Sequence, residues 1–208
     1  MGINRVDNVA VGLALMLQCR SDVMVKKLIS DVVGLMPLPL TLVTVANKEN
    51  IADVFTASWV GVLCPDPLYI GVGIDAVSYS HDLIEDNGEF TVNVIQEGFA
   101  READVLGRTS GRDLDKFEKA RITPQPAKEV KSPTILEAAI SIECKVQEVL
   151  RLGTHDLYVG RVLATHVDES VLDGDKINVE ALRPIAYAED AYWSLGRKLG
   201  QVGRVVPE

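Results

Sequence analysis

Two short segments of the sequence carry side chains suited to binding an anionic ligand. The first is Thr56-Ala57-Ser58-Trp59, on a predicted strand, and the second is Ser78-Tyr79-Ser80-His81, about twenty residues further on. Hydroxyl side chains and unpaired backbone N–H groups at the start of a helix are what a phosphate group requires. Asp82 follows directly and would repel a phosphate, and a tryptophan on a strand is usually part of a core. A phosphate site and a purely structural role are therefore both open on these residues alone.

A third segment, Gly153 to Val162, reads GTHDLYVGRV and places His155 at the mouth of a predicted hairpin. A histidine in that position is exposed enough to contact a ligand, and its ring can donate or accept a hydrogen bond. A histidine in a surface turn needs no function at all. His155 alone therefore does not choose between a catalytic role and simple exposure.

A glycine pattern nearby imitates a dinucleotide-binding site. Gly71-Val72-Gly73-Ile74-Asp75-Ala76 matches the fingerprint GxGxxG/A and follows a predicted strand. The fingerprint needs a helix that opens at its second or third glycine, whereas helical character begins here only after Ser80. We therefore interpret these glycines as relieving crowding in a tightly curved strand.

The composition indicates one ordinary globular domain. The chain has 208 residues and a mass of 22.6 kDa, with 47% hydrophobic and 25% charged residues. Its 21 basic and 30 acidic side chains give a net charge of −9. This balance argues against a general nucleic-acid binder, because contacts to phosphates need clustered Lys and Arg.

The cysteines and the apolar runs bear on where the protein works. Cys19, Cys64 and Cys144 are odd in number, widely spaced and without a CxxC pair. This argues against a disulfide framework and a metal site and favours a reducing compartment, the cytoplasm. The apolar run from Val9 to Leu17 is too short to span a bilayer, and no small-residue cleavage site follows it. We therefore expect neither a signal peptide nor a membrane partner.

Alternation with a period of two, rather than 3.6, dominates residues 38–95 and predicts strands. A short helix is predicted among them, with Ser80 as its cap, Leu83 and Ile84 facing inward, and Gly88 at its end. The four predicted strands are Leu40 to Ala46, Ala52 to Cys64, Leu68 to Ile74 and Phe90 to Ile95. Short strands joined by turns favour a closed or sandwiched antiparallel sheet.

The rest of the chain adds helices and a hairpin. Residues 97–119 have helical character, and the proline-containing stretch 120–134 is predicted to be an extended loop. The alternation from Ile140 to Gln147 predicts a strand with one buried face, paired with Leu157 to Val167 across a short turn. The predicted fold is mainly β, an antiparallel barrel of about six strands with inserted helices.

In order and spacing, these motifs resemble the flavin reductase-like family of FMN-binding split barrels. The pattern runs from the proline-rich Met36 to Leu40 through Thr56 to Trp59, then through a Ser-rich helix start to Gly88-Glu89-Phe90-Thr91-Val92-Asn93, and ends in the hairpin at 153–162. Ser58-Trp59, Asp115-Lys116-Phe117 and Tyr192 to Gly196 look most like the flavoredoxins of that family. The combination is specific, although each piece alone is not.

The resemblance also divides the chain and marks three departures. It covers residues 36–200, which leaves 1–35 as an N-terminal extension and lead-in and 201–208 as a tail. The order Met24-Val25-Lys26-Lys27 is itself typical of a chain start, so residues 1–23 are interpreted as an extension or an upstream translation start. The departures from the family pattern are Asp53 in place of a frequent Asn, Val60 in place of Thr, and Thr154 in place of an acidic residue.

The resemblance implies a Greek-key-like split barrel that forms a homodimer and holds FMN near the subunit interface. It implies that Thr56, Ala57, Ser58, Trp59 and Val60 line the flavin ring, and that Ser78, Tyr79, Ser80 and His81 hold the phosphate. Lys116 would approach the ring, where a cation stabilises negative charge on the reduced flavin. His155 would stand where NAD(P)H or another electron donor meets the flavin.

Two functions of different classes remain open, beside the simpler alternative of a flavin-binding protein without turnover. In the first, the protein is an NAD(P)H-dependent oxidoreductase that passes electrons through FMN to free flavin, ferric iron or a partner protein. In the second, it is a non-enzymatic electron carrier, reduced and oxidised by other proteins. The acidic surface is suited to a basic redox partner, although it does not choose between the two functions.

Overall fold

The computed structural model describes residues 26–29 and 34–203. The chain divides into two units, Met1–Gly34 and Leu35–Glu208, and every helix and strand discussed below belongs to the second. The apolar run Val9 to Leu17, Cys19 and most of the proposed extension lie outside the described residues. Among the residues that are described, no helix is long and apolar enough to cross a membrane.

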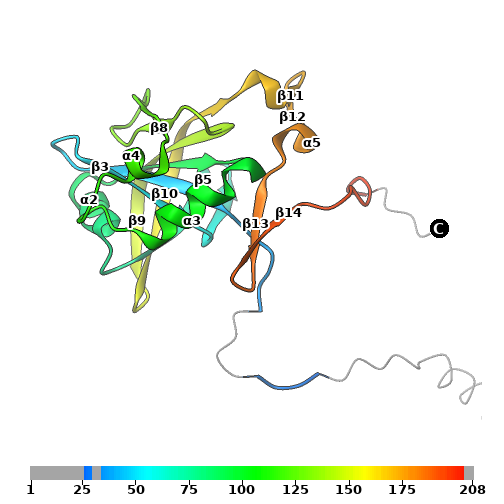
Figure 1. Ribbon diagram of the computed structural model, residues 1–208, viewed down its shortest axis with the longest axis horizontal. Helices are drawn as coiled ribbons and strands as arrows, with labels where there is room; N and C mark the ends of the chain where they lie inside the picture. Colours follow the sequence, from blue (N-terminus) through cyan, green and yellow to red (C-terminus); the bar gives the residue numbers. More distant parts are fainter. Residues whose placement is uncertain (1–25, 30–33, 204–208) are drawn as a thin grey trace, which may run out of the picture. The chain divides into compact units, whose positions relative to one another are not determined.

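A seven-stranded antiparallel sheet forms the body of the second unit (Figure 1), in the order β3-β2-β6-β9-β10-β5-β4. The strands are β2 (Thr41–Ala46), β3 (Ala52–Ala57), β4 (Val60–Pro65), β5 (Leu68–Asp75), β6 (Glu89–Val94), β9 (Ile140–Arg151) and β10 (His155–Val167). The two edge strands, β3 and β4, are consecutive in the chain and only Ser58 and Trp59 join them. The sheet must therefore curl until its edges meet, which makes a barrel that is split at this link. The predicted antiparallel barrel is confirmed.

The link between β3 and β4 corrects one prediction. Ala52 to Cys64 was expected to be one strand, but β3 pairs with β2 at one edge of the sheet and β4 pairs with β5 at the other. The chain changes edge at Ser58 and Trp59, where the N–H of Gly73 donates to the carbonyl oxygen of Trp59 at 2.8 Å. Local alternation continues through the break, so the sequence pattern does not reveal it.

The predicted helix after β5 is present as α2 (Tyr79–Asn87). Its N-cap is Ser78 rather than the predicted Ser80, because the Ser78 hydroxyl accepts from the N–H of His81 at 3.2 Å. Leu83 and Ile84 are buried as expected. Gly88 ends the helix with φ +70°, a left-handed conformation that favours glycine.

The remaining helices and small sheets surround the barrel. The helical stretch predicted over 97–119 consists of η1 (Glu97–Phe99), which runs directly into α3 (Ala100–Arg108), and of α4 (Lys116–Ala120). A loop separates α3 from α4. α2, α3 and α4 all contact β3 (Figure 1). The predicted loop 120–134 contains no element longer than the two-residue bridges β7 (Pro124–Gln125) and β8 (Thr134–Ile135) at its ends.

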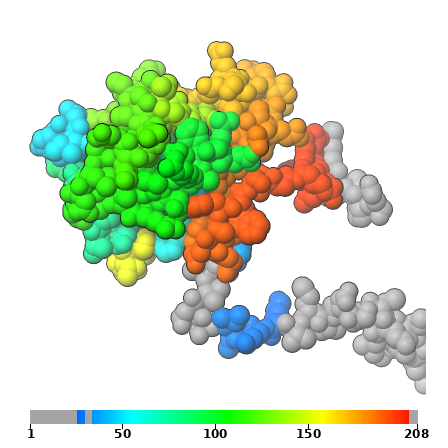
Figure 2. Space-filling model, in the orientation of Figure 1, coloured from blue at the N-terminus to red at the C-terminus, as the bar shows by residue number. Residues whose placement is uncertain are grey.

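The C-terminal part forms a separate small sheet of β1 (Leu38–Pro39), β13 (Ile185–Ala188) and β14 (Ala191–Ser194). Figure 2 shows the orange surface of this hairpin directly beside the green surface of α3, and the Tyr192 hydroxyl lies 3.3 Å from Asp104 of that helix. The hairpin β11 (Leu172–Asp173) and β12 (Lys176–Ile177), η2 (Glu169–Val171) and α5 (Val179–Leu182) precede it. The barrel thus carries helices at β3 and a short accessory sheet beside α3.

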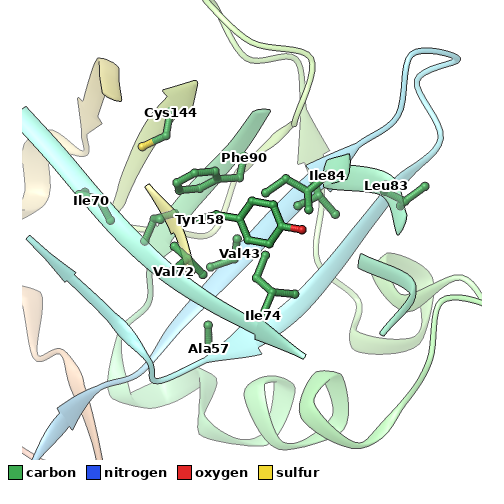
Figure 3. Packing of buried hydrophobic residues seen from close by; sticks show 12 residues of the cluster. Val43, Ala57, Ile70, Val72, Ile74, Leu83, Ile84, Phe90, Cys144 and Tyr158 are labelled. Atoms are coloured by element: carbon green, nitrogen blue, oxygen red, sulfur yellow. The ribbon is translucent and has the colours of Figure 1, made fainter. Parts of the chain in front are cut away.

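The barrel interior is the main hydrophobic core. Figure 3 shows the Tyr158 ring in the middle of this cluster, with Val43, Ile74 and Phe90 around it. A second cluster, which includes Leu42, fills the space under α3. In the barrel wall, β5 lies between β4 and β10 and is antiparallel to both, so it does not belong to a βαβ unit.

The glycines of the fingerprint-like segment lie on β5. A Cβ on Gly71 would come within 2.9 Å of Leu63 Cδ1 and 3.1 Å of Leu157 Cδ1. Those side chains fill the space that a larger residue would need. These contacts agree with the interpretation of this glycine as a relief of crowding, and the antiparallel pairing of β5 with β4 and β10 rules out the dinucleotide fingerprint.

Candidate functional site

A cleft of about 440 Å³ opens at the end of β3, a size within the usual range for small-molecule sites. Its walls come from the β3–β4 link, the start of α2, the loop between α3 and α4, and the hairpin of β9 and β10. Nine of the eleven predicted site residues line it: Thr56, Ala57, Ser58, Trp59, Ser78, Tyr79, Ser80, Lys116 and His155. The structure thus gathers segments that lie up to a hundred residues apart in the chain.

Two larger hollows lack such convergence. One, of about 780 Å³, lies against α3 and α4 and is lined by exposed side chains of both signs. The other, of about 1060 Å³, is lined by the β11–β12 hairpin, α5 and residues 194–201. Neither hollow is lined by any of the eleven predicted site residues.

One wall of the cleft is built by the break between the edge strands. Thr56 donates its hydroxyl to the carbonyl oxygen of Ala103 at 2.6 Å, which fixes the end of β3 to α3. The Trp59 ring is half exposed, and its centroid lies 4.4 Å from that of His155. The link between β3 and β4 thus brings the Trp59 and His155 rings together at the cleft.

The polar end of the cleft is the first turn of α2. The first N–H groups of a helix have no partner within it and carry the positive end of its dipole. Arg112 lies beside this turn, with its guanidinium 5.7 Å from the Tyr79 ring and a hydrogen bond of 3.0 Å to the carbonyl oxygen of Val77. Arg112 also pairs with Asp82 at 2.6 Å. The acidic residue that seemed to disfavour a phosphate is therefore neutralised by an arginine from another loop.

A buried charged pair lies between these two ends. Asp53 and Lys116 expose only 3% and 4% of their side chains, and Lys116 Nζ lies 3.9 Å from Asp53 Oδ1. Ser80 donates its hydroxyl to Asp53 Oδ2 at 2.6 Å. Burial lowers the pKa of Lys116 below its ordinary value, and the charge of Asp53 opposes that fall. At 3.9 Å the pair is too long for a hydrogen bond, so it leaves the ammonium donors available to a ligand.

Sequence reasoning missed the loop between α3 and α4. Thr109, Ser110, Gly111 and Arg112 all line the cleft. A Cβ on Gly111 would lie 2.6 Å from both Asp53 Oδ1 and Tyr79 Cδ1, so only glycine lets the loop approach this closely. The sequence does contain a run of small residues followed by an arginine, which is typical of an anion-binding loop. The residues around it do not indicate which strand end the loop faces.

Val60 and His81 do not line the cleft. Val60 is the first residue of β4 and pairs with Val72. The His81 ring turns away from the cleft, and its Nε2 lies 2.8 Å from Asp156 Oδ2. The backbone N–H of His81 is bonded to the Ser78 hydroxyl.

The pair of His81 and Asp156 belongs to a charged cluster behind α2. Arg151 contacts Asp156 and also binds Glu85 at 2.7 Å, and Tyr158 donates its hydroxyl to Glu85 at 2.5 Å. The hydrogen bond from Arg151 is the main reason why the pKa of Glu85 is below its ordinary value. Because Asp156 follows His155, this cluster ties α2 to the strand that carries His155.

The chain is similar to several known proteins. A family model described as "Flavin reductase like domain" matches residues 33–196. An uncharacterized protein of Pyrococcus abyssi is 35% identical over 67% of this chain and 80% of its own length. The NADH:riboflavin 5'-phosphate oxidoreductase of Streptomyces pristinaespiralis is 28% identical over 62% of this chain and 71% of its own.

Two solved structures are similar over most of the chain. Flavoredoxin of Desulfovibrio vulgaris is 27% identical, with a TM-score of 0.80, and the match covers 86% of this chain and 98% of that one. Flavoredoxin of Methanosarcina acetivorans is 28% identical, also with a TM-score of 0.80, and covers 87% and 97%.

Proposed function

This chain belongs to the flavin reductase-like family, and on that premise we propose that it binds FMN in the cleft at the end of β3 and transfers electrons through it. One observation carries the proposal: a helix N-terminus and a buried lysine face the same cleft, beside the aromatic rings of Trp59 and His155. An anionic phosphate and a flat ring that gains negative charge on reduction are what those features suit. The flavin supplies the redox chemistry, and the protein supplies orientation and electrostatics.

The donors in the cleft fit the two ends of FMN. At the α2 end, the N–H groups at the start of the helix, the Ser78 side chain and Arg112 are placed for the phosphate, whereas the Ser80 hydroxyl is committed to Asp53. At the other end, the wall from Thr56 to Trp59 is placed for the ring. The Lys116 ammonium holds a proton near the ring and stabilises negative charge there.

NAD(P)H is the proposed electron donor, and His155 is the residue proposed to meet it. The NADH:riboflavin 5'-phosphate oxidoreductase among the relatives supports an enzyme that reduces flavin. The two similar flavoredoxins support the alternative of an electron carrier. Oxidation of NADH and NADPH with free FMN or ferric iron as acceptor discriminates between them, since a carrier turns over only with its protein partners.

We expect the purified protein to bind FMN with a visible flavin spectrum. Gly111→Ala should weaken binding at least about tenfold, because a methyl group there would push Asp53 or Tyr79 by overpacking. Gly98→Ala is the matched control, since nothing lies within 4 Å of that position. Titration of each protein, followed by absorbance and flavin fluorescence, measures the affinities. A wild-type protein that never binds FMN would refute the proposed function.

We also propose that the protein is a homodimer. Trp59, Val62, Leu63 and Leu68 on and around the edge strand β4 are large, apolar and exposed. Such a patch on a sheet edge ordinarily marks an interface. A second copy of the chain is the occupant that the family resemblance favours, and an obligate interface should bury more than about 2,000 Å².

Light scattering should therefore give a mass twice the 22.6 kDa of one chain. Val62→Lys on β4 should shift the protein towards the monomer, because it buries an unpaired charge at the proposed interface. Ile51→Lys is the control, since Ile51 is also exposed but lies in the β2–β3 turn. A monomeric wild type at micromolar concentration, with FMN bound, contradicts the dimer.

A further inference from the structure

Asp53 is the residue at which three elements of the cleft meet. It lies on β3, accepts a hydrogen bond from Ser80 in the first turn of α2, and faces Lys116 in the first turn of α4. Gly111, from the loop between α3 and α4, packs against the same carboxylate. A carboxylate this deeply buried beside a ligand cleft is expensive to maintain unless it is paired. Its placement therefore needs a reason beyond packing.

Asp53 and Lys116 form an unequal pair. The carboxylate is anchored by a short hydrogen bond from Ser80, whereas the ammonium is held by charge alone at 3.9 Å. A buried lysine without a counter-charge tends to lose its proton. A lysine that loses its proton would no longer stabilise negative charge in the cleft.

We propose that Asp53 is a positioning residue that keeps Lys116 protonated, so that the cleft presents a fixed positive charge to the flavin in both redox states. The inference rests on the proposed function for its flavin part. With asparagine at this position, the lysine would exchange a proton as the flavin changes charge.

The other charged groups near Lys116 are bound to partners other than this lysine. Asp82 on α2 and Arg112 in the loop between α3 and α4 pair with each other at 2.6 Å. On α4 itself, the N-cap Asp115 accepts from the N–H groups of Phe117 and Glu118. On α3, Asp104 pairs with Arg108 at 3.1 Å. Of the charged groups facing this lysine among the described residues, Asp53 alone is placed to hold its proton.

The first test measures the protonation of Lys116 in the FMN-free protein. NMR of side-chain Cε in a ¹³C-lysine-labelled chain follows the titration, and Lys116→Met identifies the resonance by removing it. Wild-type Lys116 should remain protonated between about pH 5 and 8, the range in which physiological switches titrate. In Asp53→Asn, which keeps the shape and an acceptor for Ser80, its pKa should fall by about one to three pH units.

The second test measures the midpoint potential of bound FMN against pH. In Asp53→Asn the potential should fall more steeply with pH than in the wild type, by one extra proton per two electrons over the range where Lys116 titrates. A tenfold change in proton activity then corresponds to about 30 mV for this two-electron couple. In Lys116→Met, the further change Asp53→Asn should add no proton, because no lysine remains to exchange one.

The outcomes separate this inference from the proposed function. A Lys116 that titrates in the same range in wild type and Asp53→Asn overturns the inference, as does an identical slope of potential against pH in the two FMN-bound proteins. The inference is also overturned if Asp53→Asn still adds one proton to the slope of potential against pH when Lys116 has been replaced by Met. If Asp53→Asn does not fold, a wild-type Lys116 that loses its proton between about pH 5 and 8 is sufficient refutation. A wild type that binds no FMN refutes the proposed function, and the NMR titration still decides whether Asp53 holds the proton.

Discussion

His155→Ala should slow the reduction of bound FMN by NAD(P)H about ten- to a hundredfold and leave FMN affinity nearly unchanged. The ring lies at the mouth of the cleft, packed on Trp59 at 4.4 Å, with Nδ1 3.0 Å from the Thr154 hydroxyl. One well-placed polar contact in a transition state is worth about 10²–10³ in rate, and less at an open site. Stopped-flow reduction by NADH and NADPH measures the effect.

A second variant separates polarity from packing. His155→Phe keeps an aromatic ring against Trp59 but removes both ring nitrogens, so it should be as slow as His155→Ala if the histidine contacts the donor. It should be as fast as wild type if the ring only shields the cleft. Unchanged rates in both variants would leave His155 as a surface residue and only the flavin-binding half of the proposed function standing.

The strands were largely predictable because their signal is local. β2, β5, β6 and the β9–β10 hairpin follow the alternation of apolar and polar residues, and turn residues separate them. The break at Ser58 and Trp59 was not predictable, because it depends on which neighbours β3 and β4 find after the sheet has curled. Local alternation contains no information about that curl.

The site was predictable in its segments but not in its contacts. Ser78 and Ser80 are equally good caps by type, and only the buried Asp53, on another strand, decides that Ser80 turns inward. The outward turn of His81 depends in the same way on Asp156, which lies seventy-five residues later. Pairing between residues so far apart in the chain is set by the fold. The resemblance to a family therefore identified the segments of the site, and the structure shows which way each side chain points.

The final prediction concerns Glu143, a second deeply buried charge, which lies on β9. Its side chain is fully buried and accepts hydrogen bonds from the N–H groups of Lys128, Glu129 and Val130 at 2.9, 2.6 and 3.2 Å. The His166 ring adds a fourth contact at 2.6 Å. Burial alone would raise the pKa of Glu143, but these hydrogen bonds outweigh it and hold the pKa below its ordinary value.

Glu143→Gln should lower the free energy of unfolding at pH 7 by about 2–4 kcal/mol, because it replaces charge-assisted hydrogen bonds in a buried site. A carboxyl whose pKa is lowered by folding stabilises the protein above its unfolded pKa, near 4.3, and loses that contribution as the pH falls through the folded value. The gap between wild type and variant should therefore narrow below about pH 4. Urea denaturation at several pH values measures it.

Glu137→Gln is the matched control, since Glu137 is only partly buried and binds the N–H and hydroxyl of Thr123 at 2.9 and 2.7 Å. It should change stability by no more than about 0.5 kcal/mol. FMN affinity should be unchanged in both variants, because neither carboxylate lines the cleft. Equal stability of Glu143→Gln and wild type would contradict the prediction. The contrast with Lys116 is physical: Glu143 has every acceptor site engaged by its own chain and serves the fold, whereas Lys116 keeps its donors free beside a cleft and is placed to serve a ligand.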